Sequence, residues 1–137
     1  MARSLVAQSM LIGSLALTCV ALPFSAVANS EVVSRVFASG TFEGRSDHIV
    51  SGGVTVLKTE TGTMVVLESD FSLDGAPDPK LGFGQNGYEP STQFSPLTSN
   101  TGAQIYTVPD SVDPTQYNEI WVWCEKFDVP LGVATLK

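Results

Sequence analysis

Short β-branched segments separated by turn residues run through most of this chain, and they limit its possible folds more than any other feature. In the clearest example, Val54–Lys58 and Thr63–Leu67 flank the polar tract Glu60-Thr61-Gly62. Two such runs joined by a short loop that contains glycine predict a β-hairpin. No stretch of the domain sequence shows a sustained helical period, so nothing in it predicts a helix.

The remaining sequence continues this pattern. The dipeptide Asn86-Gly87 is a strong tight-turn signal, and Asp74–Pro79 carries two prolines that exclude regular structure. We expect Gly40 to end a first strand and Gly40–Ser51 to form a loop. The predicted strands outside the hairpin are Arg35–Ser39, Lys80–Gly84, Phe94–Leu97, Ala103–Val108, Tyr117–Phe127 and Gly132–Leu136. Several short strands between such turns predict an all-β fold, either a single β-sandwich or a small barrel-like domain.

The N-terminal segment Met1–Ala28 has the pattern of a signal peptide. It carries one positive charge, Arg3, followed by an apolar run over Leu5–Phe24 and the small-residue sequence Ser25-Ala26-Val27-Ala28. Such a sequence predicts export and cleavage after Ala28. We therefore expect a secreted or periplasmic protein with a signal peptide over 1–28, a lead-in over 29–39 and one β domain over 40–137.

Two alternatives exist for the same segment. The apolar run is long enough for a transmembrane anchor, which needs about 20 apolar residues. However, Gln8, Gly13, Ser14 and Pro23 interrupt it, and no basic stop-transfer cluster follows. Lipid attachment at Cys19 is the third possibility, although the residues before Cys19 fit a lipidation motif poorly.

The charge of the chain excludes two classes of partner. Loss of Arg3 leaves six basic residues against fourteen acidic ones and takes the net charge from −7 to −8. An acidic surface repels both phosphate backbones and anionic lipid headgroups. We therefore expect no nucleic-acid partner and no membrane contact after cleavage.

The cysteine count is the sharpest feature of composition. Removal of Cys19 with the leader leaves Cys124 alone in the exported chain. Cysteines of exported proteins usually pair as disulfides, so an odd thiol indicates an intermolecular bond, a reactive group or a ligand. The alternative is a structural residue, because free cysteine is among the most buried residue types.

The predicted strand around Cys124 has two apolar faces. Side chains alternate along a strand, which places Cys124 and Lys126 on one face and both tryptophans, Trp121 and Trp123, on the other. We expect this strand to be central and covered on both sides, with Cys124 near the border of the core. A thiolate needs positive charge nearby, and Lys126 is a candidate to supply it.

His48 and Met64 are further candidate ligands. His48 is the only histidine, and a lone histidine in a polar loop is either a solvated side chain or a ligand. Haem iron and copper both accept His, Cys or Met, so His48, Met64 and Cys124 form a possible set, although their spacing does not predict that they meet. The C-x-x-C-H motif is absent, which excludes covalent c-type haem attachment.

Other site motifs fail. The stretch Asp70–Gly75 resembles the start of a calcium loop, but the twelfth position, which should be acidic, is Leu81. We interpret the stretch as a turn, with a looser calcium site at Asp74 and Asp78 as an alternative. Hydrolase and nucleotide-binding motifs are absent, so the sequence does not favour a stand-alone enzyme.

Several segments resemble the DM-thirteen domain family of exported and animal proteins. They are GTFEGRSDHIVSGGVTVL, LESDFSLDGAPDPKLGFG and the closing run with WVWCEKFDVPLG, which together cover about Gly40 to Leu136. Two departures are Leu131, where an aromatic residue is common, and Pro79, which we expect to break the middle strand. The resemblance implies an all-β fold and electron transfer. It also implies that Cys124 acts as a bare thiol or as a ligand to a prosthetic group such as haem, with His48 at a position where the family often has histidine.

Two hypotheses of function follow. The first is an exported redox module that uses Cys124, with His48 as a candidate second ligand and an unidentified redox partner. The second is a non-catalytic β-module that binds a protein partner and keeps Cys124 as a core residue. An intermolecular disulfide through Cys124 is a third possibility.

Overall fold

A computed structural model describes residues 13, 21 and 33–137 of the chain. The signal peptide predicted over Met1–Ala28 lies outside the described residues, apart from Gly13 and Ala21. Within the described part, no helix is long and apolar enough to cross a membrane.

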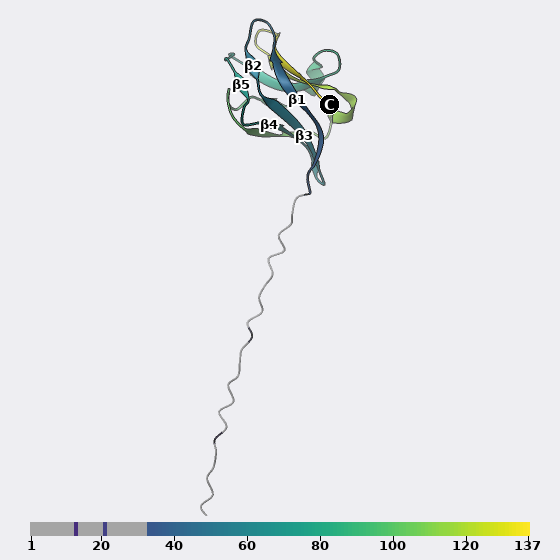
Figure 1. Ribbon diagram of the computed structural model, residues 1–137. Helices are drawn as coiled ribbons and strands as arrows, with labels where there is room; N and C mark the ends of the chain where they lie inside the picture. Colours follow the sequence, from purple (N-terminus) through teal and green to yellow (C-terminus); the bar gives the residue numbers. More distant parts are fainter. Residues whose placement is uncertain (1–12, 14–20, 22–32) are drawn as a thin grey trace, which may run out of the picture. The chain divides into compact units, whose positions relative to one another are not determined.

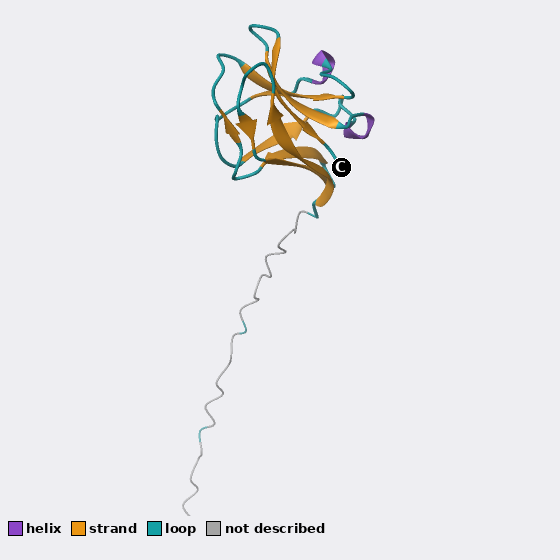
Figure 2. Cartoon of the chain, turned by 45° about the horizontal axis from the view of Figure 1, so that its top comes forward, coloured by secondary structure: helices purple, strands orange, loops and turns teal. Residues whose placement is uncertain are grey.

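The domain is built from β-strands, which confirms the all-β prediction. Eight strands form one antiparallel sheet in the order β7-β6-β9-β10-β1-β3-β4-β8, which curves into a nearly closed barrel-like wall (Figures 1 and 2). Its strands are β1 (Arg35–Gly44), β3 (Gly53–Thr59), β4 (Gly62–Leu67), β6 (Pro79–Gly84), β7 (Ser95–Pro96), β8 (Gln104–Val108), β9 (Glu119–Cys124) and β10 (Val129–Thr135). Among the described residues, helical structure is limited to two short 3₁₀ turns, η1 (Pro90–Thr92) and η2 (Pro114–Gln116).

The hairpin predicted around Glu60-Thr61-Gly62 is confirmed as β3 and β4. Its register pairs Val54 with Leu67 and Val56 with Val65. All four side chains are at most 1% exposed. The intervening residues of both strands face away from the core, as the period of two requires.

The first strand is longer than its sequence pattern predicts. β1 continues through Gly40 to Gly44, so the prediction that Gly40 ends the strand is wrong. A Cβ atom at Gly40 would collide with the carbonyl oxygen of Thr135. The glycine therefore lets β1 approach β10 closely, and a strand glycine can mark such an approach as well as an end.

A separate pair of strands covers one end of the sheet. β2 (Val50–Ser51) and β5 (Ser72–Leu73) pair with each other, and they lie side by side in Figure 1. The side chain of Val50 packs directly on Gly132 of β10, where a Cβ atom would meet it at 2.9 Å. The bulky Val50 and Leu73 thereby seal this end of the core, and both are at most 5% exposed.

Strand β9 lies between β6 and β10, so it is central in the hydrogen-bonded order as expected. Only its inner face is fully buried, whereas its outer face is half-buried. The expected cover on both sides is therefore complete on the inner face and partial on the outer face. Pro79 does not break a strand, because it is the first residue of β6, a position at which a strand tolerates proline.

Candidate functional site

Cys124 is the last residue of β9 and points into the core. Its neighbours across the sheet are Pro79 on β6 and Val129 on β10. It shares the inner face of β9 with Ile120 and Val122, which are 0% exposed, and it is 1% exposed itself. The thiol is free and belongs to the main hydrophobic cluster of the domain.

Lys126 does not accompany Cys124 into the core. β9 ends at Cys124, so the alternation of side chains stops before Lys126 is reached. Lys126 lies in the exposed turn that leads to β10, with its Nζ atom 5.5 Å from the centroid of the Phe127 ring. The structure places this positive charge over an exposed ring and not beside the buried sulfur.

His48 lies in the loop between β1 and β2, where it forms a pair with Asp74. The Nδ1 atom of His48 is 2.8 Å from Oδ1 of Asp74, and the backbone N–H of Ile49 donates to Oδ2 at 3.0 Å. The backbone hydrogen bond from Ile49, followed by the contact with His48, holds the pKa of Asp74 below its usual value. This pair ties the loop before β2 to the residue that follows β5, next to the pair of strands that seals the core.

The three candidate ligands do not come together. Met64 lies on β4 between inward-facing residues, so it faces away from the core that holds Cys124. His48 is bound to Asp74 in a loop. In the described part of the chain, no group of three His, Cys, Asp or Glu side chains is arranged to hold a metal ion, and Asp74 with Asp78 forms no such group either.

Haem does not fit at Cys124. An axial thiolate needs an open face above the sulfur for the macrocycle, but inward-facing side chains such as Leu81, Val122 and Leu131 fill the core of which Cys124 is part, each at 0% exposure. A cavity of about 270 Å³ lies elsewhere, lined by residues from the middle and end of β1 and the end of β10 such as Gly40 and Thr135, and it includes neither Cys124 nor His48. The residues present therefore do not support a haem pocket built on this thiol.

The outer face of β9 carries an aromatic cluster, formed by Tyr88, Trp121 and Trp123. Tyr88 stacks on Trp123 with ring centroids 4.4 Å apart and planes inclined by 13°. The two tryptophans meet edge to face at 6.2 Å. All three side chains are half-buried and thus remain partly accessible. Alternation along the strand predicts that the two tryptophans share one face, but it does not predict Tyr88, which reaches them from the loop after β6.

Two glycines of β6 make room for this cluster. Gly82 pairs with Trp121 and Gly84 with Glu119. A Cβ atom at Gly82 would lie 2.7 Å from the ring of Tyr88, and one at Gly84 would lie 2.5 Å from Nε1 of Trp121. The tight turn at Asn86-Gly87, where both residues have positive φ, then directs Tyr88 back over the strand. The turn is confirmed, and the alternate glycines are the sequence signal for this close approach.

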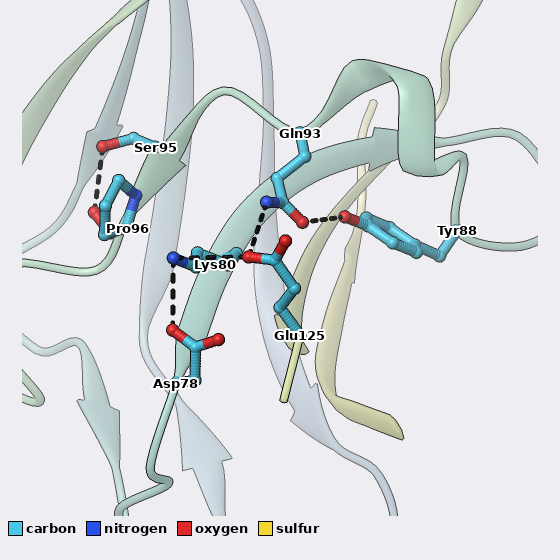
Figure 3. Close-up of polar contacts among 7 residues, drawn as sticks. All are labelled: Asp78, Lys80, Tyr88, Gln93, Ser95, Pro96 and Glu125. Carbon is cyan, nitrogen blue, oxygen red and sulfur yellow. Dashed lines mark hydrogen bonds and ion pairs between the residues drawn. The ribbon is translucent and has the colours of Figure 1, made fainter. Parts of the chain in front are cut away.

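Polar side chains surround the aromatic cluster. Figure 3 shows Lys80 between two carboxylates, with its Nζ atom 3.1 Å from Asp78 and 3.3 Å from Glu125. Glu125 also accepts a hydrogen bond from Gln93, and Gln93 accepts one from the hydroxyl of Tyr88 (Figure 3). These contacts link the turn after β9 to the loop that carries Tyr88.

Both indole N–H groups donate to carboxylates. Trp121 donates to Glu119 at 2.9 Å, and Trp123 donates to Asp128 at 3.2 Å. Burial, and then the negative charges of Glu125, Asp128 and Glu89, raise the pKa of Tyr88 to about 12. The outer face of β9 is thus aromatic at its centre and negatively charged around it.

Comparison with known proteins gives one match. The family model described as Electron transfer DM13 matches residues 41–136, which include His48, the aromatic cluster and Cys124. No curated protein and no solved structure matches the chain significantly.

Proposed function

The chain belongs to the electron transfer DM13 family, and we propose that it acts as an exported electron-transfer module whose redox group is the bare thiol of Cys124. The observation that carries this proposal is the position of Cys124. It is the free thiol of the family-matched domain, and it ends β9 one residue before an exposed turn. A bare thiol agrees with the filled core better than a haem ligand does.

Burial limits what this thiol can do. A bound group must touch the sulfur, whereas an electron can cross a thin layer of protein. In the proposed step the S–H bond breaks, one electron passes to a one-electron acceptor, and the proton passes to water when the turn after β9 opens locally. The resulting sulfur radical returns to the thiol when it takes back one electron and one proton.

Replacement of the thiol tests this proposal. We expect Cys124→Ser and Cys124→Ala to abolish electron exchange with a soluble one-electron mediator, measured by voltammetry, while circular dichroism shows the fold retained. Met64→Leu is the matched control. It removes the other sulfur-bearing candidate, which faces outward on β4, and it should leave the electron exchange unchanged. Undiminished electron exchange in both Cys124 variants would refute the thiol as the redox group.

The 1% exposure of Cys124 favours a second candidate, a protein-binding β-module with a structural cysteine. Under this alternative Cys124→Ala lowers the free energy of unfolding by about 1 kcal/mol, the scale of a small buried group, and changes no redox property. The mediator experiment therefore separates the two functions.

Export rests on the sequence pattern of Met1–Ala28. We expect the protein recovered after secretion to begin at Asn29, which intact-mass spectrometry would establish. A mature protein that retains Met1 would contradict cleavage of the leader.

A further inference from the structure

We propose that the outer face of β6 and β9, with the aromatic cluster at its centre, is the docking surface for a basic redox protein. This inference rests on the proposed electron-transfer function and adds the site and the charge of the partner. The cluster lies on the same strand as the thiol, since Trp123 directly precedes Cys124 and points to the opposite side of the sheet.

The side chains at the centre of this face are of the kind that protein interfaces favour. Tryptophan and tyrosine dominate the binding energy of many protein interfaces, because they offer a large area and have few rotamers to lose. Tyr88 and Trp123 are stacked and hydrogen-bonded, so they are already held in place. Little ordering of these rings is needed when a partner binds.

The charge around the aromatic cluster is mainly negative. Five carboxylates surround the cluster, and they belong to Asp78, Glu89, Glu119, Glu125 and Asp128. Two lysines lie among them: Lys80 is bound between two of the carboxylates, and Lys126 lies in the exposed turn. The excess of negative charge matches a surface rich in Lys and Arg, and such complementarity speeds the encounter of the two proteins.

The same charges exclude other occupants. A second copy of this chain would present an identical acidic face and repel the first. Anionic lipid surfaces would be repelled as well. Weak complexes between redox proteins need only a small interface, so a face of two strands with one covering loop is large enough.

The location of the tryptophans gives a direct test. The chain contains two tryptophans, and both belong to the cluster. A cationic c-type cytochrome serves as the probe for the full mature protein. We expect it to quench the tryptophan emission saturably, and we expect calorimetry to give an affinity that falls as ionic strength rises to about 0.15 M.

Paired variants separate this face from the overall charge. Glu125→Gln with Asp128→Asn removes two exposed charges at the cluster but keeps their hydrogen-bonding atoms. Glu60→Gln with Asp110→Asn removes two exposed charges near the β3–β4 turn. We expect the first pair to weaken binding about 3- to 10-fold and the second less than about twofold, because rim charges act mainly at short range.

Equal weakening by both pairs would show attraction by net charge alone and would overturn the proposal, as would binding without any change in tryptophan emission. Dimerisation of the chain that the first pair strengthens would assign the face to a second copy and overturn it too. Cys124→Ser should bind the probe normally. If Cys124→Ser binds the probe normally and still exchanges electrons, the thiol is refuted as the redox group while the docking face stands. If the wild-type protein does not bind the probe, the docking face is refuted while the thiol stands.

Discussion

The two faces of β9 differ in how they are covered, although both carry large apolar side chains. On the inner face, Ile120, Val122 and Cys124 are enclosed by the whole barrel and are at most 1% exposed. On the outer face, Trp121 and Trp123 are covered by a single loop, mainly through Tyr88. The curvature of the sheet thus decides which face is insulated from water and which face can meet a partner.

The largest expected difference between the faces is in stability. Ile120→Ala should lower the free energy of unfolding by about 3 kcal/mol, because it leaves a cavity in a core that cannot collapse around it. Ile105→Ala is the control, since Ile105 is 64% exposed on β8 and should change stability by less than about 0.5 kcal/mol. Urea unfolding followed by circular dichroism measures both. Similar losses in the two variants would contradict the description of the inner face.

The next effect concerns Tyr88 on the outer face. Its pKa in the folded protein is raised to about 12, above the ordinary value of about 10. The unfolded chain therefore loses this proton first, and the corresponding stabilisation is complete below about pH 10 and is lost between about pH 10 and 12. We expect Tyr88→Phe to reduce this loss in alkaline urea unfolding, and Tyr117→Phe to retain it. If the alkaline stability profile of Tyr88→Phe is the same as that of the wild type, the hydroxyl group of Tyr88 is not shielded from water in the folded protein.

The smallest effect is expected at the His48–Asp74 pair beside the sealed end. The lowered pKa of Asp74 means that its stabilisation is present above about pH 4 and is lost as pH falls through the folded pKa. Asp74→Asn should therefore flatten the acid side of the stability profile slightly, because the pair is partly exposed. Asp47→Asn, a change in the same loop, should leave the acid side of the stability profile as steep as in the wild type. Identical acid profiles for the wild type and Asp74→Asn would show that the pair does not stabilise the loop.

Local sequence patterns predict the strands well, because strand and turn formation depends mainly on residues that are close together in the sequence. The alternation in Val54–Lys58 and Thr63–Leu67 and the turn at Asn86-Gly87 are sufficient to predict the β3–β4 hairpin and the turn before Tyr88. The prediction at Gly40 is wrong because the reason for that glycine is β10, which is distant in sequence and packs against it.

The site is less predictable for the same reason. The inward direction of Cys124 follows from alternation with Ile120 and Val122, but its degree of burial depends on residues of β6 and β10. The partner of His48 is Asp74, 26 residues away, and no spacing rule links them. Tyr88 reaches Trp123 through a loop whose course is set by two glycines and a turn.

If the chain is exported as proposed, the depth of Cys124 has a consequence in an oxidising compartment. A disulfide requires two sulfur atoms about 2 Å apart, and two folded copies cannot bring their sulfurs that close while β6, β10 and the core enclose them. The thiol is open to such a reaction only before β9 is paired on both sides. A dimer linked through Cys124 would therefore have formed from chains that met while still unfolded.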